Sequence, residues 1–199
     1  FRHKKSAYRN KIFYAMNIIV VPYNSDYYYI RPDTTLEKES NDYYCPDSVS
    51  HISTAPCIYV RIIKAGKTVN NKFASRYFES YGFGVFLYGE NLIGKNPLSF
   101  SVASSCDYTS ILPTKMYNFS TIEEYSFEFI INGENYSTFC ANDLFVEFIY
   151  KQITKISAMI SLRIGDFVAF ELSDRIPVQK NSTLLGKKNQ DLLFNFRIC

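Results

Sequence analysis

Residues 58–81, with the sequence IYVRIIKAGKTVNNKFASRYFESY, are the most informative stretch of the chain. Ile58–Ile63 is rich in β-branched side chains and predicts a strand. A turn at Ala65-Gly66-Lys67 follows, and Asn71 then predicts the N-cap of a helix that runs to about Ser80. Apolar side chains recur along that helix at spacings of three and four: Phe73, Ala74, Tyr77, Phe78 and Tyr81. Gly82 is placed to end the helix, and Val85–Tyr88 predicts the next strand.

The rest of the sequence adds strands and a second helix. Further strands are predicted at 18–21, 27–30, 125–131, 136–139, 167–171, 184–187 and 192–198. Asn132-Gly133 is a strong hairpin signal, and Asn142 predicts the cap of a helix to about Ala158. The polar, serine-rich residues 94–121 predict mostly loop. Without a repeat or a linker, this pattern predicts one β-rich α+β domain.

Composition narrows the class of protein. The chain has 199 residues, of which 47% are hydrophobic and 21% are charged, which suits a compact domain and excludes a disordered tail, a collagen-like fibre or a small disulfide scaffold. No apolar run approaches the roughly 18 residues of a membrane span. Only 2 His and 8 Gly are present. These are few for catalysis, because His is the usual general base and Gly-rich loops hold phosphates.

The positive charge is concentrated at the start of the sequence. The net charge is +3, yet residues 1–15 carry five basic groups and no acid, so the remainder is slightly acidic. A nucleic-acid partner is therefore not expected, since it needs a basic face on the folded domain. Residues 1–15 are interpreted as a basic extension outside the fold, with Met16 as the natural start and 16–199 as the domain. A signal peptide is the alternative interpretation.

The cysteines indicate free thiols in a reducing compartment, and hence a cytoplasmic protein. Their number is odd, their spacing is wide, and no Cys-x-x-Cys occurs, which argues against a zinc site or a disulfide framework. They are Cys45, Cys57, Cys106, Cys140 and Cys199. His51 and Cys57 are a possible nucleophile pair, but a surface His and a buried thiol are the simpler interpretation.

The order of several short motifs resembles the fumarylacetoacetate hydrolase family in its short single-domain form. The motifs are Arg31-Pro32-Asp33-Thr34, Arg61-Ile62, Gly66-Lys67, Phe73-Ala74-x-Arg76-Tyr77, Asn132-Gly133-Glu134 and Leu162-x-x-Gly165-Asp166. The resemblance implies the fold of that family's C-terminal domain, with mixed sheets or a β-roll and two helices, often as a homodimer. It also implies Mg²⁺ or Mn²⁺ chemistry on keto acids and diketo acids: C–C hydrolysis, decarboxylation or isomerisation.

The resemblance places the family's metal ligands on residues that cannot serve. The two Glu of its Glu-x-Glu-Leu strand fall on Ala55 and Cys57, and its Asp falls on Phe86. Alanine and phenylalanine have no ligand atom, and a thiol is too soft for Mg²⁺. No catalytic residue, metal ligand or cofactor is therefore assigned. The former substrate cleft is expected at Arg31, Glu90, Asp107, Glu171 and Leu172, where Leu172 replaces a substrate-contacting Thr.

Two hypotheses about function follow from this pattern. In the first, the chain is a catalytically inactive relative, free of metal, that acts by binding or dimerisation; a decayed gene product is not separable from it by sequence. In the second, substitute carboxylates rebuild a divalent-metal site that acts on a small keto acid, drawn from Asp47, Glu90, Asp107 and Glu171. Expected partners are a second copy of the chain and a small keto-acid ligand. The tyrosine runs at 27–29 and 43–44 are candidate interface residues.

Overall fold

The computed structural model of the protein describes residues 16–124 and 126–199. The interpretation of residues 1–15 as an extension lies outside this range. The strands are β1 (Ile18–Val21), β2 (Tyr29–Arg31), β3 (Leu36–Glu37), β4 (Ile52–Ile62), β5 (Phe78–Gly89), β6 (Ser110–Ile111), β7 (Tyr117–Asn118), β8 (Ser126–Ile131), β9 (Glu134–Cys140), β10 (Phe167–Glu171), β11 (Ile176–Val178), β12 (Thr183–Lys188) and β13 (Asp191–Arg197). The α-helices are α1 (Ser99–Ala103) and α2 (Asp143–Met159), and 3₁₀ helices cover 33–35, 71–77, 90–92 and 119–124.

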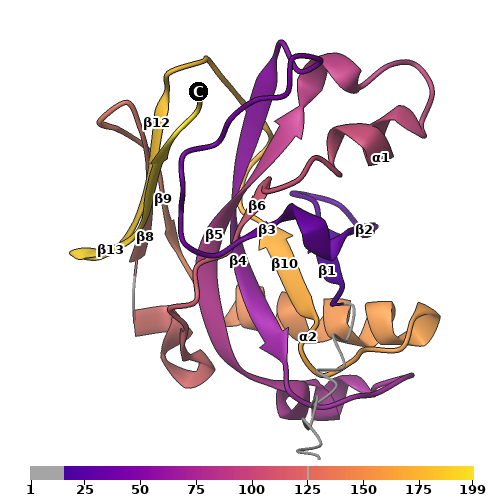
Figure 1. The fold of residues 1–199 in the computed structure, drawn as a ribbon. Coiled ribbons are helices and arrows are strands. Elements are labelled where there is room, and N and C mark those ends of the chain that lie inside the picture. The colour runs from indigo at the N-terminus through magenta and orange to yellow at the C-terminus, as the bar shows by residue number, and fades with distance from the viewer. Residues whose placement is uncertain (1–15, 125) are drawn as a thin grey trace, which may run out of the picture.

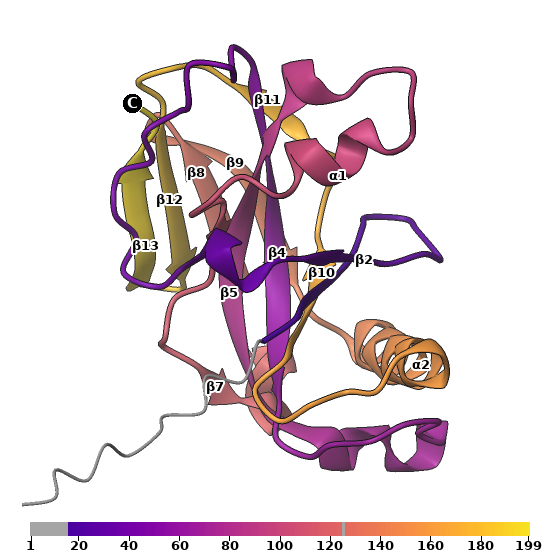
Figure 2. The same cartoon turned by 45° about the vertical axis from the view of Figure 1, so that its right-hand side comes forward.

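Two sheets make up the β-rich α+β fold that the sequence predicts (Figure 1). The larger has the order β2-β1-β10-β4-β5-β6-β3, with β11 also paired to β4 and β7 to β5. Its centre is the long antiparallel pair β4–β5, and β10 pairs antiparallel with β4 but parallel with β1. The smaller sheet, β13-β12-β8-β9, lies beside β4 and β5 in Figure 2.

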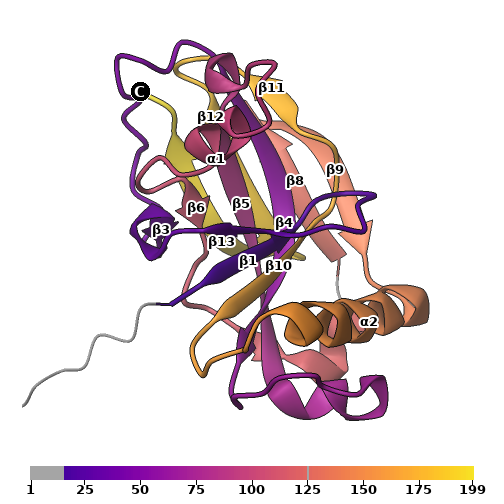
Figure 3. The same cartoon turned by 90° about the vertical axis from the view of Figure 1, so that its right-hand side faces the viewer.

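The large sheet is buried on both faces. On one face the smaller sheet and α2 enclose the larger core, which includes Phe83, Phe127, Ile153 and Phe194. Figure 3 shows α2 beside the 3₁₀ helix of residues 71–77, at one end of the sheet. The other face holds a second, smaller core, which Tyr29 and Phe100 help to cover. No helix in the described residues is long and apolar enough to cross a membrane.

Local signals in the sequence identify the hairpin and α2 correctly. Asn132 and Gly133 both have positive φ, at 52° and 84°, as the tight turn between β8 and β9 requires. The Asn142 side chain accepts a hydrogen bond of 3.0 Å from the backbone N–H of Phe145 and so caps α2. The predicted apolar stripe of α2 faces the core, where Ile149 and Ile153 are fully buried.

The prediction of a helix from Asn71 to about Ser80 is partly wrong. The helix is of 3₁₀ type, Asn70 caps it, and it ends at Tyr77. Phe78 already belongs to β5 and pairs with Ile62 of β4. Apolar side chains at helical spacing also fit an extended strand with two buried faces. Pairing with β4 favours the strand over the helix from Phe78 onward.

The prediction that residues 94–121 are mostly loop needs a smaller correction. This segment contains the short helix α1 and the two-residue strands β6 and β7, both of which pair with β5. Such short elements give no periodic pattern, because tertiary pairing rather than local sequence forms them. Their place matters for the site, since α1 lies over the second core and contributes Phe100 to its cover.

Candidate functional site

The second face of the large sheet brings together the positions on which the resemblance places the family's metal ligands. Ala55 on β4 lies opposite Phe86 on β5, and Cys57 is two residues along β4 on the same face. All three side chains are fully buried in the second core. The three positions therefore form one contiguous surface in the fold, although 29 residues separate Cys57 from Phe86 in the sequence.

This surface does not fit a divalent cation of the hard class. A methyl group and a phenyl ring offer no lone pair, and Mg²⁺ and Mn²⁺ prefer oxygen ligands to thiols. Burial also raises the pKa of the Cys57 thiol well above its usual value, and the negative charge of Glu171 adds to this, which disfavours a thiolate. Within residues 16–124 and 126–199, no group of three or more His, Cys, Asp or Glu side chains is placed to hold a metal ion.

A guanidinium group lies over this surface instead. Arg31, at the end of β2, is fully buried, and its Cζ lies 4.9 Å from the ring centroid of Phe86 and 5.0 Å from that of Tyr88. Its Nη2 donates to the carbonyl oxygen of Leu87 at 2.9 Å and to the hydroxyl of Thr109 at 2.7 Å. Nε and Nη1 are buried without a hydrogen-bond partner among the described residues. A permanent charge is therefore held in a largely aromatic setting.

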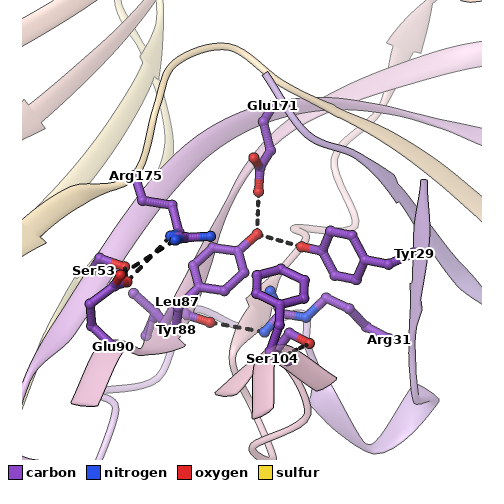
Figure 4. Close-up of polar contacts among 10 residues, drawn as sticks. Tyr29, Arg31, Ser53, Leu87, Tyr88, Glu90, Ser104, Glu171 and Arg175 are labelled. Carbon is purple, nitrogen blue, oxygen red and sulfur yellow. Dashed lines mark hydrogen bonds and ion pairs between the residues drawn. The ribbon is translucent and has the colours of Figure 1, made fainter. Parts of the chain in front are cut away.

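A chain of hydroxyl and carboxyl groups runs beside Arg31 (Figure 4). The hydroxyl oxygens of Tyr29 and Tyr88 are 2.5 Å apart, and the Tyr88 hydroxyl donates to Oε1 of Glu171. Burial raises the pKa of the Glu171 carboxyl, while the Tyr88 hydroxyl and then the backbone N–H of Tyr23 act in the opposite direction. Burial likewise raises the pKa of Tyr88 well above its usual value. Glu171 is consequently a carboxyl that holds its proton more tightly than an exposed one.

A partly exposed ion pair lies on the other side of Tyr88 from Tyr29 (Figure 4). Arg175 Nε lies 3.3 Å from Oε2 of Glu90, and Ser53 donates to the same oxygen at 2.5 Å. The Arg175 guanidinium also lies over the Tyr88 ring, with its Cζ 5.5 Å from the centroid. Tyr88 thus contacts both guanidinium groups as well as Glu171, which makes it the centre of the cluster.

Two cavities open beside this cluster and share Pro22, Tyr23 and Glu171. The first has a volume of about 430 Å³, and its further lining residues are Asn24, Ser25, Asp26, Phe139, Phe145, Phe148 and Leu172. The second has a volume of about 310 Å³, and its further lining residues are Glu90, Asp174 and Arg175. Both lie where the parallel strands β1 and β10 end, because Pro22 follows Val21 and Glu171 follows Phe170 in register. The carboxyl ends of parallel strands are a common place for ligand sites.

Four of the five residues expected in the former cleft meet here. Glu171 and Leu172 line the first cavity, Glu90 lines the second, and Arg31 lies behind Tyr88. Asp107 does not join them, since it lines a separate cavity. The ring of Tyr88 and the side chain of Arg175 were not foreseen, because their contacts join strands far apart in the sequence and leave no local pattern.

The other candidates from the sequence are dispersed. Asp47 and His51 line a further cavity of about 870 Å³, at the end of the sheet where β4 begins. His51 is exposed while Cys57 is fully buried, so the two side chains do not form an accessible nucleophile pair. Of the substitute carboxylates for a rebuilt metal site, Asp47, Asp107 and Glu171 line different cavities. Glu90 lines one cavity with Asp47 and another with Glu171.

The fold is that of several solved structures, although their sequences differ widely from this one. A fumarylacetoacetate hydrolase family protein from Yersinia pestis superposes with a TM-score of 0.78 at 19% identity, covering 93% of each chain. Fumarylpyruvate hydrolase from Pseudomonas aeruginosa, solved with Mn²⁺ and pyruvate, gives 0.77 at 12% identity, covering 92% of this chain and 89% of that one. 2-Hydroxyhepta-2,4-diene-1,7-dioate isomerase from Mycobacterium marinum gives 0.78 at 13% identity, covering 92% and 74%.

The chain has the fumarylacetoacetate hydrolase fold. The sequence itself matches no protein-family model and no curated protein. The similarity to these solved structures is thus one of fold. Arg31 lies over Phe86 and Glu171 pairs with Cys57 across the strands, so the Arg31–Tyr88–Glu171 cluster adjoins the positions on which the resemblance places metal ligands.

Proposed function

We propose that this chain is a divergent member of the fumarylacetoacetate hydrolase family that has lost the divalent-metal site and acts by binding rather than by the family's metal-dependent chemistry. The observation that supports this most strongly is the replacement of the whole ligand set. Ala55, Cys57 and Phe86 are adjacent, fully buried and packed together. A site that had lost one ligand would retain the other two.

The charge of Arg31 supports the same proposal. A metal ion in such a site supplies positive charge next to an enolate or oxyanion. Here a guanidinium lies within cation–π distance of Phe86 and Tyr88, and it is fixed by hydrogen bonds to Leu87 and Thr109. A divalent cation placed beside this fixed charge would be repelled, because little water is present to screen the two.

A metal titration tests the proposal. The purified chain is titrated with Mn²⁺ and Mg²⁺ by calorimetry, and Mn²⁺ binding is checked by the loss of the free-ion electron paramagnetic resonance signal. We expect no saturable binding in the micromolar range. A triple variant, Ala55→Glu, Cys57→Glu and Phe86→Asp, should regain Mn²⁺ binding, and more so with Arg31→Gln added, since Arg31 would otherwise pair with the new carboxylate at position 86.

An enzyme with a rebuilt site is the second candidate. Glu171 favours it, because a carboxyl with a raised pKa that lines two cavities is a suitable general acid or base. This candidate predicts turnover of oxaloacetate or an acylpyruvate that Glu171→Gln abolishes. The first candidate predicts no turnover above that of Glu79→Gln, a variant at an exposed position of β5.

We also propose that the chain is a cytoplasmic homodimer. All five cysteines are unpaired in the structure, as is usual in a reducing compartment. Tyr44 and Tyr108 are strongly exposed and line one cavity with Tyr43 and Asp107, and tyrosine is enriched in protein interfaces. Sedimentation equilibrium should give a dimer that Tyr44→Asp weakens, whereas a monomeric wild-type chain would contradict the dimer.

A further inference from the structure

The larger of the two cavities beside Glu171 has aromatic walls and is here called the aromatic cavity. It is the cavity of about 430 Å³ between the segment after β1, the end of β9 and the first turns of α2. Tyr23, Phe139, Phe145 and Phe148 contribute rings to its lining, and Leu172 adds an apolar side chain. Such a cavity is large enough for a small organic molecule and can bury most of its apolar surface.

The walls of the aromatic cavity are held by contacts outside it. The ring centroids of Phe139 and Phe145 are 4.9 Å apart in an edge arrangement, and Phe148 lies 5.8 Å from the buried ring of Phe170. Asp26, a lining residue from the segment after β1, is held by Lys155 of α2, whose Nζ lies 3.3 Å from the Asp26 carboxylate. The cavity is therefore largely formed before a ligand arrives, which reduces the entropy lost on binding.

A largely buried carboxyl group is part of the lining of this apolar space. Glu171 is only 9% exposed, and its Oε1 accepts the hydrogen bond from Tyr88. Its Oε2 accepts only a long contact of 3.4 Å, from the backbone N–H of Tyr23, among the described residues. A carboxylate can accept about four hydrogen bonds, so Glu171 retains accepting capacity, and it lines both cavities.

The charges around the cavities favour a cation over an anion. Asp26 and Glu171 line the aromatic cavity, and Glu90, Asp174 and Arg175 line the adjoining one. Asp26 is paired with Lys155 of α2, so Glu171 is the acid of the aromatic cavity that remains to attract a cation. The only lining cation among these residues, Arg175, is already paired with Glu90. Arg31 is not a lining residue, and its charge lies behind the Tyr88 ring. A keto acid would meet carboxylates here without an unpaired lining cation to hold its own carboxylate.

We infer that the aromatic cavity binds a small organic amine in its ammonium form. The ammonium group donates to Glu171, and the apolar body of the ligand packs among Phe139, Phe145 and Phe148. The combination of a desolvated carboxylate with aromatic faces is suited to cationic ligands, because the rings attract the cation and the carboxylate neutralises it. The inference rests on the proposed binding role of the chain and specifies the class of ligand.

Three probes of similar shape separate charge from apolar packing: benzylamine, benzyl alcohol and benzoate. Each is titrated into the full chain by calorimetry, and binding is confirmed by saturation-transfer NMR. We expect benzylamine to bind at least about tenfold more tightly than benzyl alcohol, because a hydrogen bond between charged groups contributes about that much to affinity. Benzoate should bind more weakly than either.

Two matched variants assign the effect to Glu171. Glu171→Gln keeps an acceptor for Tyr88 and should lower benzylamine affinity by about tenfold or more while leaving benzyl alcohol unchanged. The exposed Glu79→Gln should change neither. Near-ultraviolet circular dichroism checks that both variants are folded, and the benzyl alcohol titration shows independently that the cavity is intact.

Several results would overturn the inference. These are equal affinities for benzylamine and benzyl alcohol, tighter binding of benzoate or pyruvate, or no binding of any probe by the wild-type chain. The proposed loss of the metal site fails on a different measurement, namely micromolar Mn²⁺ affinity in the absence of any amine. The two failures can therefore be distinguished in the same preparation.

Discussion

Replacing Arg31 by methionine tests whether the buried guanidinium stabilises the fold. The substitution keeps an apolar stem of similar length but removes the hydrogen bonds to Leu87 and Thr109 and the contacts with Phe86 and Tyr88. Two hydrogen bonds to a charged group amount to about 3–6 kcal/mol. Two partly desolvated cation–π contacts add about 1–3 kcal/mol.

Part of this loss is offset. Nε and Nη1 of Arg31 are buried without partners in the described part of the chain, and each such group costs about 1–3 kcal/mol. Removing them therefore returns about 2–6 kcal/mol. The central values leave Arg31→Met destabilised by about 2–3 kcal/mol, which corresponds to a fall in Tm of roughly 5–10 °C for a chain of this size. Arg31→Lys keeps the charge but not the planar fork, so a smaller loss is expected.

Urea unfolding followed by circular dichroism measures this difference. The midpoint should fall while the slope of the free energy against urea stays constant, since the native fold is kept. Arg61→Met, at an exposed position of β4, is the matched control and should change stability by less than about 0.5 kcal/mol. An Arg31→Met protein as stable as the parent, or more stable, would show that the guanidinium does not stabilise the fold and that an apolar side chain suits this site at least as well.

Three further predictions concern single groups. Because burial raises the pKa of Glu171 above its usual 4.5, the folded state binds this proton more tightly than the unfolded state does. The free energy of unfolding should therefore fall as pH rises from about 4.5. In urea titrations at several pH values, Glu171→Gln should lessen that fall, and identical pH profiles for the two proteins would contradict the raised pKa. Cys140 is exposed and Cys57 is fully buried, so a thiol reagent should label Cys140 in the native protein, and Cys57 only after unfolding; rapid native labelling of Cys57 would argue against the closed second core. Asn142→Ala removes the cap of α2 and should cost about 1 kcal/mol in thermal unfolding, with an unchanged Tm as the contrary result.

The sequence is informative wherever a structure depends on neighbouring residues. The turn at Asn132-Gly133 needs two residues that tolerate positive φ, and the cap at Asn142 needs one side chain that reaches a backbone N–H two or three residues on. Both are visible in a few letters. The end of the helix that begins at Asn71 is not visible in the sequence. The pairing of Phe78 with Ile62 ends this helix, and that pairing depends on the whole sheet.

The candidate site shows the same division. The resemblance identified Ala55, Cys57 and Phe86 as equivalent positions, and β4 and β5 bring them together. The resemblance also placed Arg31 in the former cleft, but no local pattern indicates that its guanidinium lies over the ring of Tyr88, since that contact arises from the packing of β2 against β5. Interactions over such separations are set by topology, and a single sequence carries no local signal for them.

Glu171 illustrates why composition is an incomplete guide to chemistry. The shortage of His and Gly predicts a chain poor in catalytic groups, but composition does not describe the surroundings of the groups that are present. A single carboxyl, desolvated and bonded to Tyr88, acquires properties that an exposed Glu lacks. Its position at the end of β10, beside the end of β1, makes it available to two cavities.

We propose that the surface formed by Ala55, Cys57 and Phe86 does not bind a divalent metal ion. The most direct test is Mn²⁺ binding by the purified full chain, followed by electron paramagnetic resonance of the free ion. We expect the free-ion signal to be unchanged by protein at micromolar concentration, and the triple carboxylate variant with Arg31→Gln to lower it. Stoichiometric Mn²⁺ binding by the wild-type chain in the micromolar range would show that the metal site is present.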